Sequence, residues 1–232
     1  MDLKFQVFGS GSSVDLDCMV FLEGYDTIPS NKESSDLCQK YSEMIAIYTG
    51  TDKPVNTNIA ILRDGIVAEC YKGTPDEVNN SLCLTYQLHK QYYPLQLDRL
   101  SKRDVELKIL RTLRVILSFL SRSEHRKIVK KALKADVYAK IGTLAKIDLS
   151  KVERHDVKVS MEDYHKVIAF QLGQTIALLR DIELYTKEGI GGYFPELKKM
   201  LDRKEHNGVI LERYKKLLLS MISKRKFQKI EE

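Results

Sequence analysis

The sequence predicts an α+β fold, in which a small domain with a mixed β-sheet at residues 1–100 is followed by an all-α helical bundle at residues 101–232. Short apolar runs separated by turn residues fill the first hundred positions, whereas apolar residues recur at helical spacing through most of the remainder. The charge changes at the same place: residues 1–100 hold 8 Lys and Arg against 14 Asp and Glu, and residues 101–232 hold 30 against 18. This asymmetry indicates different partners for the two domains.

The composition, 43% hydrophobic and 30% charged, is typical of a globular protein of 232 residues. No apolar run reaches the roughly 20 residues that a membrane-spanning helix needs, and the first residues lack the pattern of a secretory signal. The four cysteines form no C-x-x-C pair and are expected to be reduced thiols. We therefore expect a cytoplasmic protein without a membrane partner.

Alternation and turn residues predict five strands in the first domain: Leu3 to Phe8, Val14 to Leu22, Met44 to Tyr48, Val55 to Leu62 and Ile66 to Tyr71. The first two strands and the last two are expected to pair as hairpins. Ser30 and Glu33 form a capping box for a helix that ends near Ser42. Thr74 caps a second helix, which runs to about Tyr92.

Apolar periodicity predicts helices in the second domain at residues 103–121, 123–135, 137–147, 160–185, 194–204 and 209–223. Ser123 and Ser160 are the expected N-caps of two of them. Asp148 to Val159 reads as a polar connection, and Gly189 to Gly192 is expected to break the chain.

The most informative motif follows the first strand, where a turn of glycines and serines leads into Asp15-Leu16-Asp17. Side chains alternate along a strand, so Asp15 and Asp17 are expected to share a face. Neighbouring carboxylates repel each other, and a cation between them removes the conflict. Paired carboxylates suit Mg²⁺, which completes its coordination with water and phosphate oxygens. Backbone N–H groups and serine hydroxyls of the turn can contact such phosphates.

Gly9-Ser10 followed by Asp15-Leu16-Asp17 resembles the signature of the nucleotidyltransferase superfamily of the DNA polymerase β type, over residues 1–75. The resemblance implies a nucleotidyltransferase-like domain in which Asp15 and Asp17 are catalytic and hold Mg²⁺ or Mn²⁺. It also implies a nucleoside triphosphate as substrate. The nucleotide-binding residues that it implies are Gly9, Ser10, Ser12 and Ser13.

Two features depart from the pattern of the superfamily. The loop between the Gly-Ser pair and Asp15 has only the four residues 11–14, and the superfamily usually has a longer one. The strand that should carry a third carboxylate instead holds Asn56 and Asn58 on one face. An amide oxygen can coordinate a cation but carries no charge, and we include Asn58 among the expected metal ligands. Three interpretations remain: weak metal binding, substitution by Asp64 or Glu69, or loss of catalysis.

Basic residues concentrate at 102–134, where 11 Lys and Arg stand against 3 Asp and Glu. A basic stripe can follow an RNA or DNA backbone. The expected nucleic-acid contacts are Lys108, Arg111, Arg114, Arg122, Arg126, Lys127, Lys130, Lys131 and Lys134. A solvated helix face and a membrane-surface helix are the alternatives.

The sequence therefore predicts a metal-dependent nucleotidyltransferase that transfers a nucleoside monophosphate from a triphosphate to RNA or DNA. The alternative is a catalytically inactive nucleotidyltransferase-like domain that binds nucleic acid or a protein. A transferase acting on a small metabolite is a third possibility.

The five histidines are scattered along the chain and show no catalytic pattern.

Overall fold

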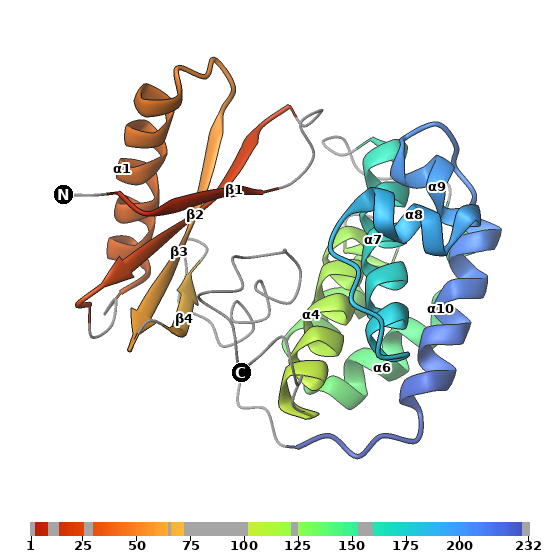
Figure 1. The fold of residues 1–232 in the computed structure, drawn as a ribbon. Coiled ribbons are helices and arrows are strands. Elements are labelled where there is room, and N and C mark those ends of the chain that lie inside the picture. Colours follow the sequence, from red (N-terminus) through yellow and green to blue (C-terminus); the bar gives the residue numbers. More distant parts are fainter. Residues whose placement is uncertain are drawn as a thin grey trace. The chain divides into compact units, whose positions relative to one another are not determined.

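The computed structural model describes residues 3–8, 14–25, 30–64, 66–71, 102–121, 125–152 and 160–228. The chain forms two compact units, Met1–Asp104 and Val105–Glu232, which we treat separately (Figure 1). The described elements comprise a small mixed sheet and a larger number of helices, as expected for an α+β protein. The predicted domain boundary after residue 100 lies outside the described residues.

Unit 1 contains a four-stranded sheet in the order β1-β2-β3-β4. The hairpin of β1 (Phe5–Phe8) and β2 (Leu16–Glu23) is antiparallel, as is that of β3 (Val55–Arg63) and β4 (Ile66–Tyr71). Both hairpins predicted from the sequence are confirmed. β2 and β3 are parallel, and α1 (Asn31–Thr49) makes the crossover that such a pair requires.

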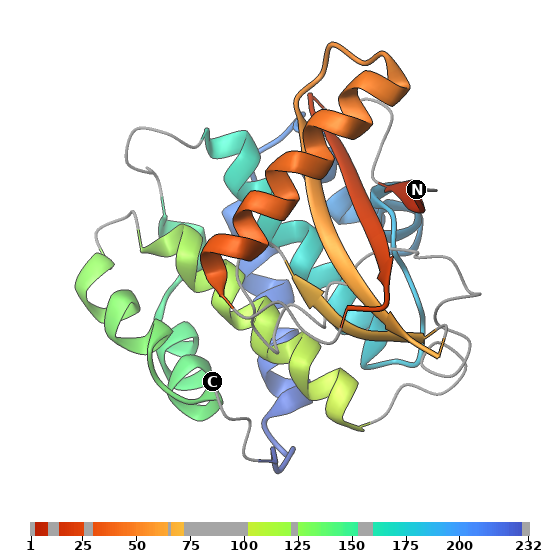
Figure 2. The same ribbon diagram turned by 90° about the vertical axis from the view of Figure 1, so that its left-hand side faces the viewer.

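The helix α1 lies against one face of the sheet (Figure 2). It begins as predicted, because Ser30 Oγ accepts a hydrogen bond from the Glu33 N–H over 3.2 Å. It ends at Gly50, whose φ of 61° is a left-handed conformation that glycine adopts without strain.

Two expectations for this helix are wrong. α1 does not end near Ser42, and Met44 to Tyr48 is its last part rather than a strand. Tyr41 and Ile45 lie one helical turn apart, and both are buried against the sheet. Ile47, two residues after the buried Ile45, is 83% exposed. A strand would place these two side chains on the same face, so the difference favours the helix.

The two faces of the sheet differ in chemistry. The face covered by α1 forms an apolar core made of Cys18, Val20, Leu22, Tyr41, Ile45, Ile59 and Ile61. The alternate residues of β2 and β3 lie on the opposite face, and they include Asp17, Met19, Asn56 and Asn58. Cys18 and Cys38, whose side chains are described, are not part of a disulfide. The polar candidate residues thus lie on the face away from α1.

All regular elements that the structure describes in unit 2 are helices. Its elements are α4 (Lys102–Leu120), α5 (Arg126–Leu133), α6 (Val137–Lys146), a short 3-10 helix η2 (Leu149–Lys151), α7 (Met161–Leu178), α8 (Lys187–Tyr193), α9 (Pro195–Leu201) and α10 (Gly208–Ile222). α7 is the central helix and contacts α8, α9 and α10 (Figure 1). Every residue from Gln171 to Leu178 is buried, so this helix forms the core of the unit.

Two predictions for unit 2 differ from the structure. α7 starts after the Ser160 cap as predicted but ends at Leu178 rather than Tyr185, because the chain takes a left-handed conformation at Asp181, with φ of 59°. Gly189 to Gly192 does not break the chain and lies inside α8. A Cβ at Gly191 would lie 3.3 Å from Lys198 Cβ, so the glycine allows α8 and α9 to pack closely.

Buried polar contacts fix the connection after α6 to α10. Glu212 Oε2 accepts a hydrogen bond from the Leu149 N–H over 2.8 Å. Lys215 Nζ lies 2.9 Å from the same oxygen and also donates to the carbonyl of Ile147. Glu212 and Lys215 are both buried, and these contacts satisfy their charges.

Some predicted elements cannot be compared with the structure. The helix from Thr74 to about Tyr92, the Ser123 cap and residues 153–159 of the polar connection lie outside the described residues. In the described part of the chain, no helix combines the length and the hydropathy needed to cross a bilayer.

Candidate functional site

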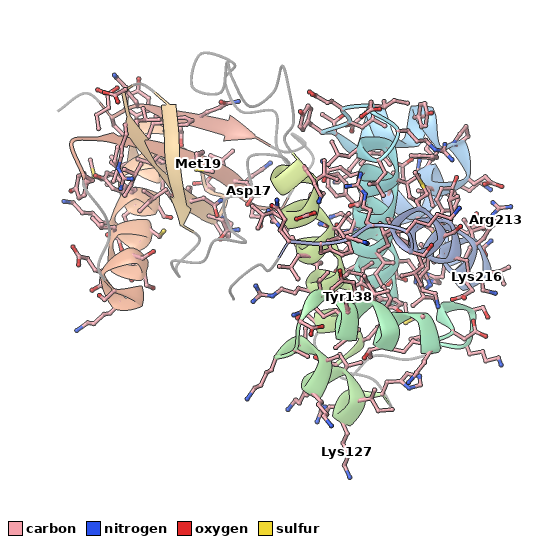
Figure 3. The ribbon with its side chains drawn as sticks, turned by 90° about the horizontal axis from the view of Figure 1, so that it is seen from below. Asp17, Met19, Lys127, Tyr138, Arg213 and Lys216 are labelled. Atoms are coloured by element: carbon pink, nitrogen blue, oxygen red, sulfur yellow. The ribbon has the colours of Figure 1, made fainter. Side chains whose placement is uncertain are left out.

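Asp15 and Asp17 lie where β2 begins. β2 starts at Leu16 rather than at Val14, so Asp15 occupies the bend directly before the strand and Asp17 is the second strand residue. Figure 3 marks Asp17 and Met19 on this strand. In the parallel register, Asp17 pairs with Asn56 and Met19 pairs with Asn58. Asp17, Asn56 and Asn58 therefore occupy one face of the sheet.

A hydrogen bond joins this group to Asp15. Asn56 Nδ2 donates to Asp15 Oδ2 over 2.7 Å. Asn56 is thus next to Asp17 in the register and in contact with Asp15. The two carboxylates gather around one amide at the N-terminal ends of two parallel strands. Both aspartates are half-buried, so water or a ligand can still reach them.

Asn58 is the buried member of the group, at 3% exposure. Its Nδ2 donates to the carbonyl of Cys18 over 3.4 Å. Its Oδ1 is buried and accepts no hydrogen bond from any residue that the structure describes. Buried polar atoms normally have a partner, so this oxygen is an acceptor open to a cation, a water or another ligand.

The donor set fits a hard divalent cation. It supplies two carboxylates and one amide oxygen with an open lone pair, and all three are oxygen ligands of the kind that Mg²⁺ and Mn²⁺ take. Mg²⁺ usually binds through one or two carboxylates and fills its other positions with water and substrate phosphates. No cluster of three or more His, Cys, Asp or Glu with metal-binding geometry occurs among the described residues. With two carboxylates, the arrangement suits a metal whose remaining ligands are water and phosphate oxygens.

Neither proposed substitute for the third carboxylate lies near this group. Asp64 follows the end of β3, eight residues beyond Asn56, which is about 26 Å along a strand. The backbone of Glu69 pairs with Ile61, five residues beyond Asn56, which is about 16 Å. A cation bound by Asp17 requires ligands within about 2.1 Å. Asp64 and Glu69 therefore do not complete the site.

The expected phosphate contacts of Gly9, Ser10, Ser12 and Ser13 cannot be placed, because these residues lie outside the described part of the chain. The hairpin of β1 and β2 on either side is described, with Phe8 paired to Asp17. Phe8, which directly precedes these residues in the chain, thus lies beside Asp17.

The expected nucleic-acid contacts separate into two groups. Lys108 is fully buried, and its Nζ donates to Gln171 Oε1 over 3.1 Å. Burial lowers the pKa of Lys108 well below its usual value, and the nearby Arg111 lowers it further. The expectation that Lys108 contacts nucleic acid is wrong, since this side chain faces α7 inside the unit.

The remaining basic residues are more accessible. Arg111 and Arg114 on α4 are half-buried, and Arg122 lies outside the described residues. The exposed residues of the predicted set are Arg126, Lys127, Lys130, Lys131 and Lys134, all on α5 or at its end. Figure 3 shows Lys127 extending away from the helices. The basic surface is therefore a feature of α5 more than of α4.

The structure also brings together residues that the sequence did not single out. The rings of His165 and His206 lie 5.5 Å apart between centroids, and His206 Nε2 is 3.2 Å from Glu162 Oε1. His165 Nδ1 lies 2.9 Å from the carbonyl of Met161. Burial lowers the pKa of His165, and the nearby His206 lowers it further. No sequence pattern signals a pair of residues that only the packing of α7 against the segment before α10 creates.

No protein-family model, curated protein or solved structure matches this chain significantly. Function is therefore inferred from the chemistry of its own residues.

Proposed function

We propose that unit 1 binds a divalent cation and a nucleoside triphosphate, and that the protein is a nucleotidyltransferase acting on a nucleic-acid acceptor. The observations that carry this proposal are the Asn56–Asp15 hydrogen bond, the place of Asp17 beside Asn56 in the register, and the open oxygen of Asn58 on the same face of the sheet. The small mixed sheet followed in the chain by helices is consistent with the nucleotidyltransferase-like fold that the motif implies.

In this proposal each residue has a defined role. Asp15 and Asp17 hold Mg²⁺ or Mn²⁺, and Asn58 offers a neutral oxygen ligand. Asn56 holds Asp15 in place through its amide. A bound divalent cation would neutralise charge on the attacking hydroxyl and on the leaving pyrophosphate. By resemblance, the loop that contains Gly9, Ser10, Ser12 and Ser13 contacts the phosphates.

The test is calorimetric titration of ATP, GTP, CTP and UTP with Mg²⁺ into the full chain and into Asp15→Asn/Asp17→Asn. The expected result is binding that requires Mg²⁺ and disappears in the double variant. Asp64→Asn is the matched control, because it removes one carboxylate from the far end of the sheet. Asp64 has φ of 52°, a conformation that Asn tolerates. Absence of any triphosphate binding in the wild type would rule the proposal out.

The second candidate function is a catalytically inactive nucleotidyltransferase-like domain that binds nucleic acid or a protein. The distance of Asp64 and Glu69 from the aspartate pair favours it, because neither residue is close enough to replace the third carboxylate. The two candidates differ in turnover. Incubation with labelled nucleotide, Mg²⁺ and an oligonucleotide should extend the oligonucleotide if the enzyme is active. Binding without extension would favour the inactive domain.

A further inference from the structure

The exposed side of α5 is a row of lysines. Lys127, Lys130, Lys131 and Lys134 fall within an arc of about 100° around the helix axis, and all four are exposed. Val129 and Ala132 on the opposite side are buried. Within the described part of the chain, none of the four lysines forms an ion pair. Their charges are thus available to a polyanion.

The surroundings of this row in the sequence are also basic. Residues 125–147, which form α5, α6 and their connection, contain seven Lys and Arg and one acidic residue, Asp136. Asp136 is engaged as the N-cap of α6, where its Oδ1 accepts from the Ala139 N–H over 2.8 Å. The Asp136 carboxylate therefore caps α6, and residues 125–147 carry a strongly positive net charge.

The segment after α10 adds three basic residues, Lys224, Arg225 and Lys226. The sequence suggests a frayed end at residues 224–229, but residues 224–228 are described and held in place. The Phe227 N–H donates to Tyr138 Oη over 3.0 Å, and the Gln228 N–H donates to Glu106 Oε2 over 3.2 Å. These contacts hold Phe227 at α6 and Gln228 at α4, and Lys224, Arg225 and Lys226 directly precede them in the chain.

An aromatic pair lies at the junction of the tail and α6. The rings of Tyr138 and Phe227 pack edge to face, with centroids 5.6 Å apart. Tyr138 is 54% exposed although it contacts the tail. Proteins stack the bases of single strands on exposed aromatic rings beside positively charged grooves, and Tyr138 lies in a segment of the sequence rich in lysine.

We infer that α5, α6 and the C-terminal segment form one binding surface for single-stranded nucleic acid, in which the lysines contact phosphates and Tyr138 stacks a base. We call it the α5–tail surface, and it comprises Lys127, Lys130, Lys131, Lys134, Tyr138, Lys224, Arg225 and Lys226. The inference rests on the proposed function for its biological role, since it names the form of the acceptor. The aromatic pair favours a single strand over a duplex, whose bases are already stacked. A membrane surface would need an apolar helix face, and α5 exposes one large apolar side chain, Ile128.

The test measures fluorescence anisotropy of labelled 20-nucleotide U and dT strands with the full chain, in EDTA and without nucleotide. These conditions separate the inference from the metal site, because Asp15→Asn/Asp17→Asn should bind the strands as well as the wild type. The first variant replaces Lys127, Lys130, Lys131 and Lys134 by Gln. Its matched control replaces the same number of exposed lysines elsewhere in unit 2, namely Lys198, Lys199, Lys204 and Lys216.

We expect the first variant to weaken binding at least tenfold and to reduce the slope of log affinity against log salt by about 2 to 3. The control variant should stay within about twofold, since its lysines lie outside the surface. Tyr138→Leu should weaken single-strand binding about fivefold or more and leave binding of a 20-base-pair duplex unchanged. Circular dichroism checks that each variant is folded.

Three results would overturn the inference. The first is absence of single-strand binding by the wild type at 50 mM KCl. The second is equal loss in the control variant, which would mean attraction by net charge alone. The third is a duplex preference that Tyr138→Leu does not alter, which would assign the surface to double-stranded nucleic acid.

Discussion

Asn56 donates a hydrogen bond from Nδ2 to Asp15 Oδ2 over 2.7 Å, and so links the start of β3 to the residue that precedes β2. In the register of the sheet, the same amide lies beside Asp17. An uncharged side chain thus occupies the position between two carboxylates. A third carboxylate there would raise the negative charge of the site and would repel its neighbours when no cation is bound.

This relationship predicts the effect of Asn56→Asp. The variant should bind Mn²⁺ about tenfold more tightly, because an added carboxylate strengthens a site made of oxygen ligands. Without metal it should be less stable than the wild type, since three neighbouring carboxylates repel each other. Calorimetric Mn²⁺ titration and urea unfolding in EDTA measure the two effects. Asn56→Ala is the control, because it removes the hydrogen bond without adding charge and should not tighten binding. Unchanged Mn²⁺ affinity in Asn56→Asp would argue against a cation at this position.

Lys108 predicts a stability that depends on pH. Its pKa is lowered in the folded state by burial and by Arg111, so the unfolded chain binds more protons between the lowered value and about 10.4. The free energy of unfolding should therefore rise as pH increases from 7 towards 10. Lys108→Met should remove this rise and stabilise the protein at pH 7 by about 1 to 3 kcal/mol. Urea unfolding at pH 7 and pH 9 provides the measurement. The exposed Lys198→Met should change neither quantity, and an unaltered pH dependence in Lys108→Met would contradict the assignment.

His165 predicts a second pH dependence, in the acidic range. Burial lowers its folded pKa below the unfolded value of about 6.5, so the unfolded state binds more protons between the two values. The free energy of unfolding should fall as pH decreases through this range and should be insensitive to this residue above pH 7. His165→Asn keeps a donor for the Met161 carbonyl but does not titrate. Its unfolding free energy should depend less steeply on pH below about 6.5. An identical slope in variant and wild type would show that other groups cause it.

Two glycines on helices predict opposite effects of the same substitution. A Cβ at Gly142 on α6 meets no atom within 4 Å, so Gly142→Ala should stabilise the protein by about 0.5 to 1 kcal/mol. A Cβ at Gly173 on α7 would lie 2.6 Å from Ile190 Cγ2 and 3.1 Å from Leu197 Cδ1. Gly173→Ala should therefore destabilise the protein by about 1 to 3 kcal/mol. Thermal unfolding of both variants checks the sign of each change, and two shifts in the same direction would contradict this packing.

Local signals in the sequence predicted local structure well. The caps at Ser30 and Ser160 depend on residues within one helical turn, so they can be identified without knowledge of the fold. The segment Met44 to Tyr48 was ambiguous because a short apolar run suits either a strand or a helix. The packing of Tyr41 and Ile45 on the sheet decides between them, and that contact involves strands that are distant in sequence.

Which residues form the candidate site depends on contacts between segments that are far apart in the sequence. Asp15 and Asp17 could be named from the D-x-D pattern alone. The contact of Asn56 with Asp15 spans 41 positions and depends on the register of two parallel strands, which the sequence does not state. Lys108 was misassigned for the same reason, because charge spacing on α4 does not reveal which side of the helix packs against α7.

The contacts of α10 with the turn after α6 set an order for synthesis of the chain. The Leu149 N–H and the Ile147 carbonyl meet their partners Glu212 and Lys215, which follow 63 and 68 residues later. A ribosome therefore makes α4 to α9 before the turn after α6 can form its contacts with α10. A nascent chain that stops short of α10 keeps the apolar side of α7 uncovered and open to chaperones and proteases. Synthesis of α10 thus decides whether unit 2 matures.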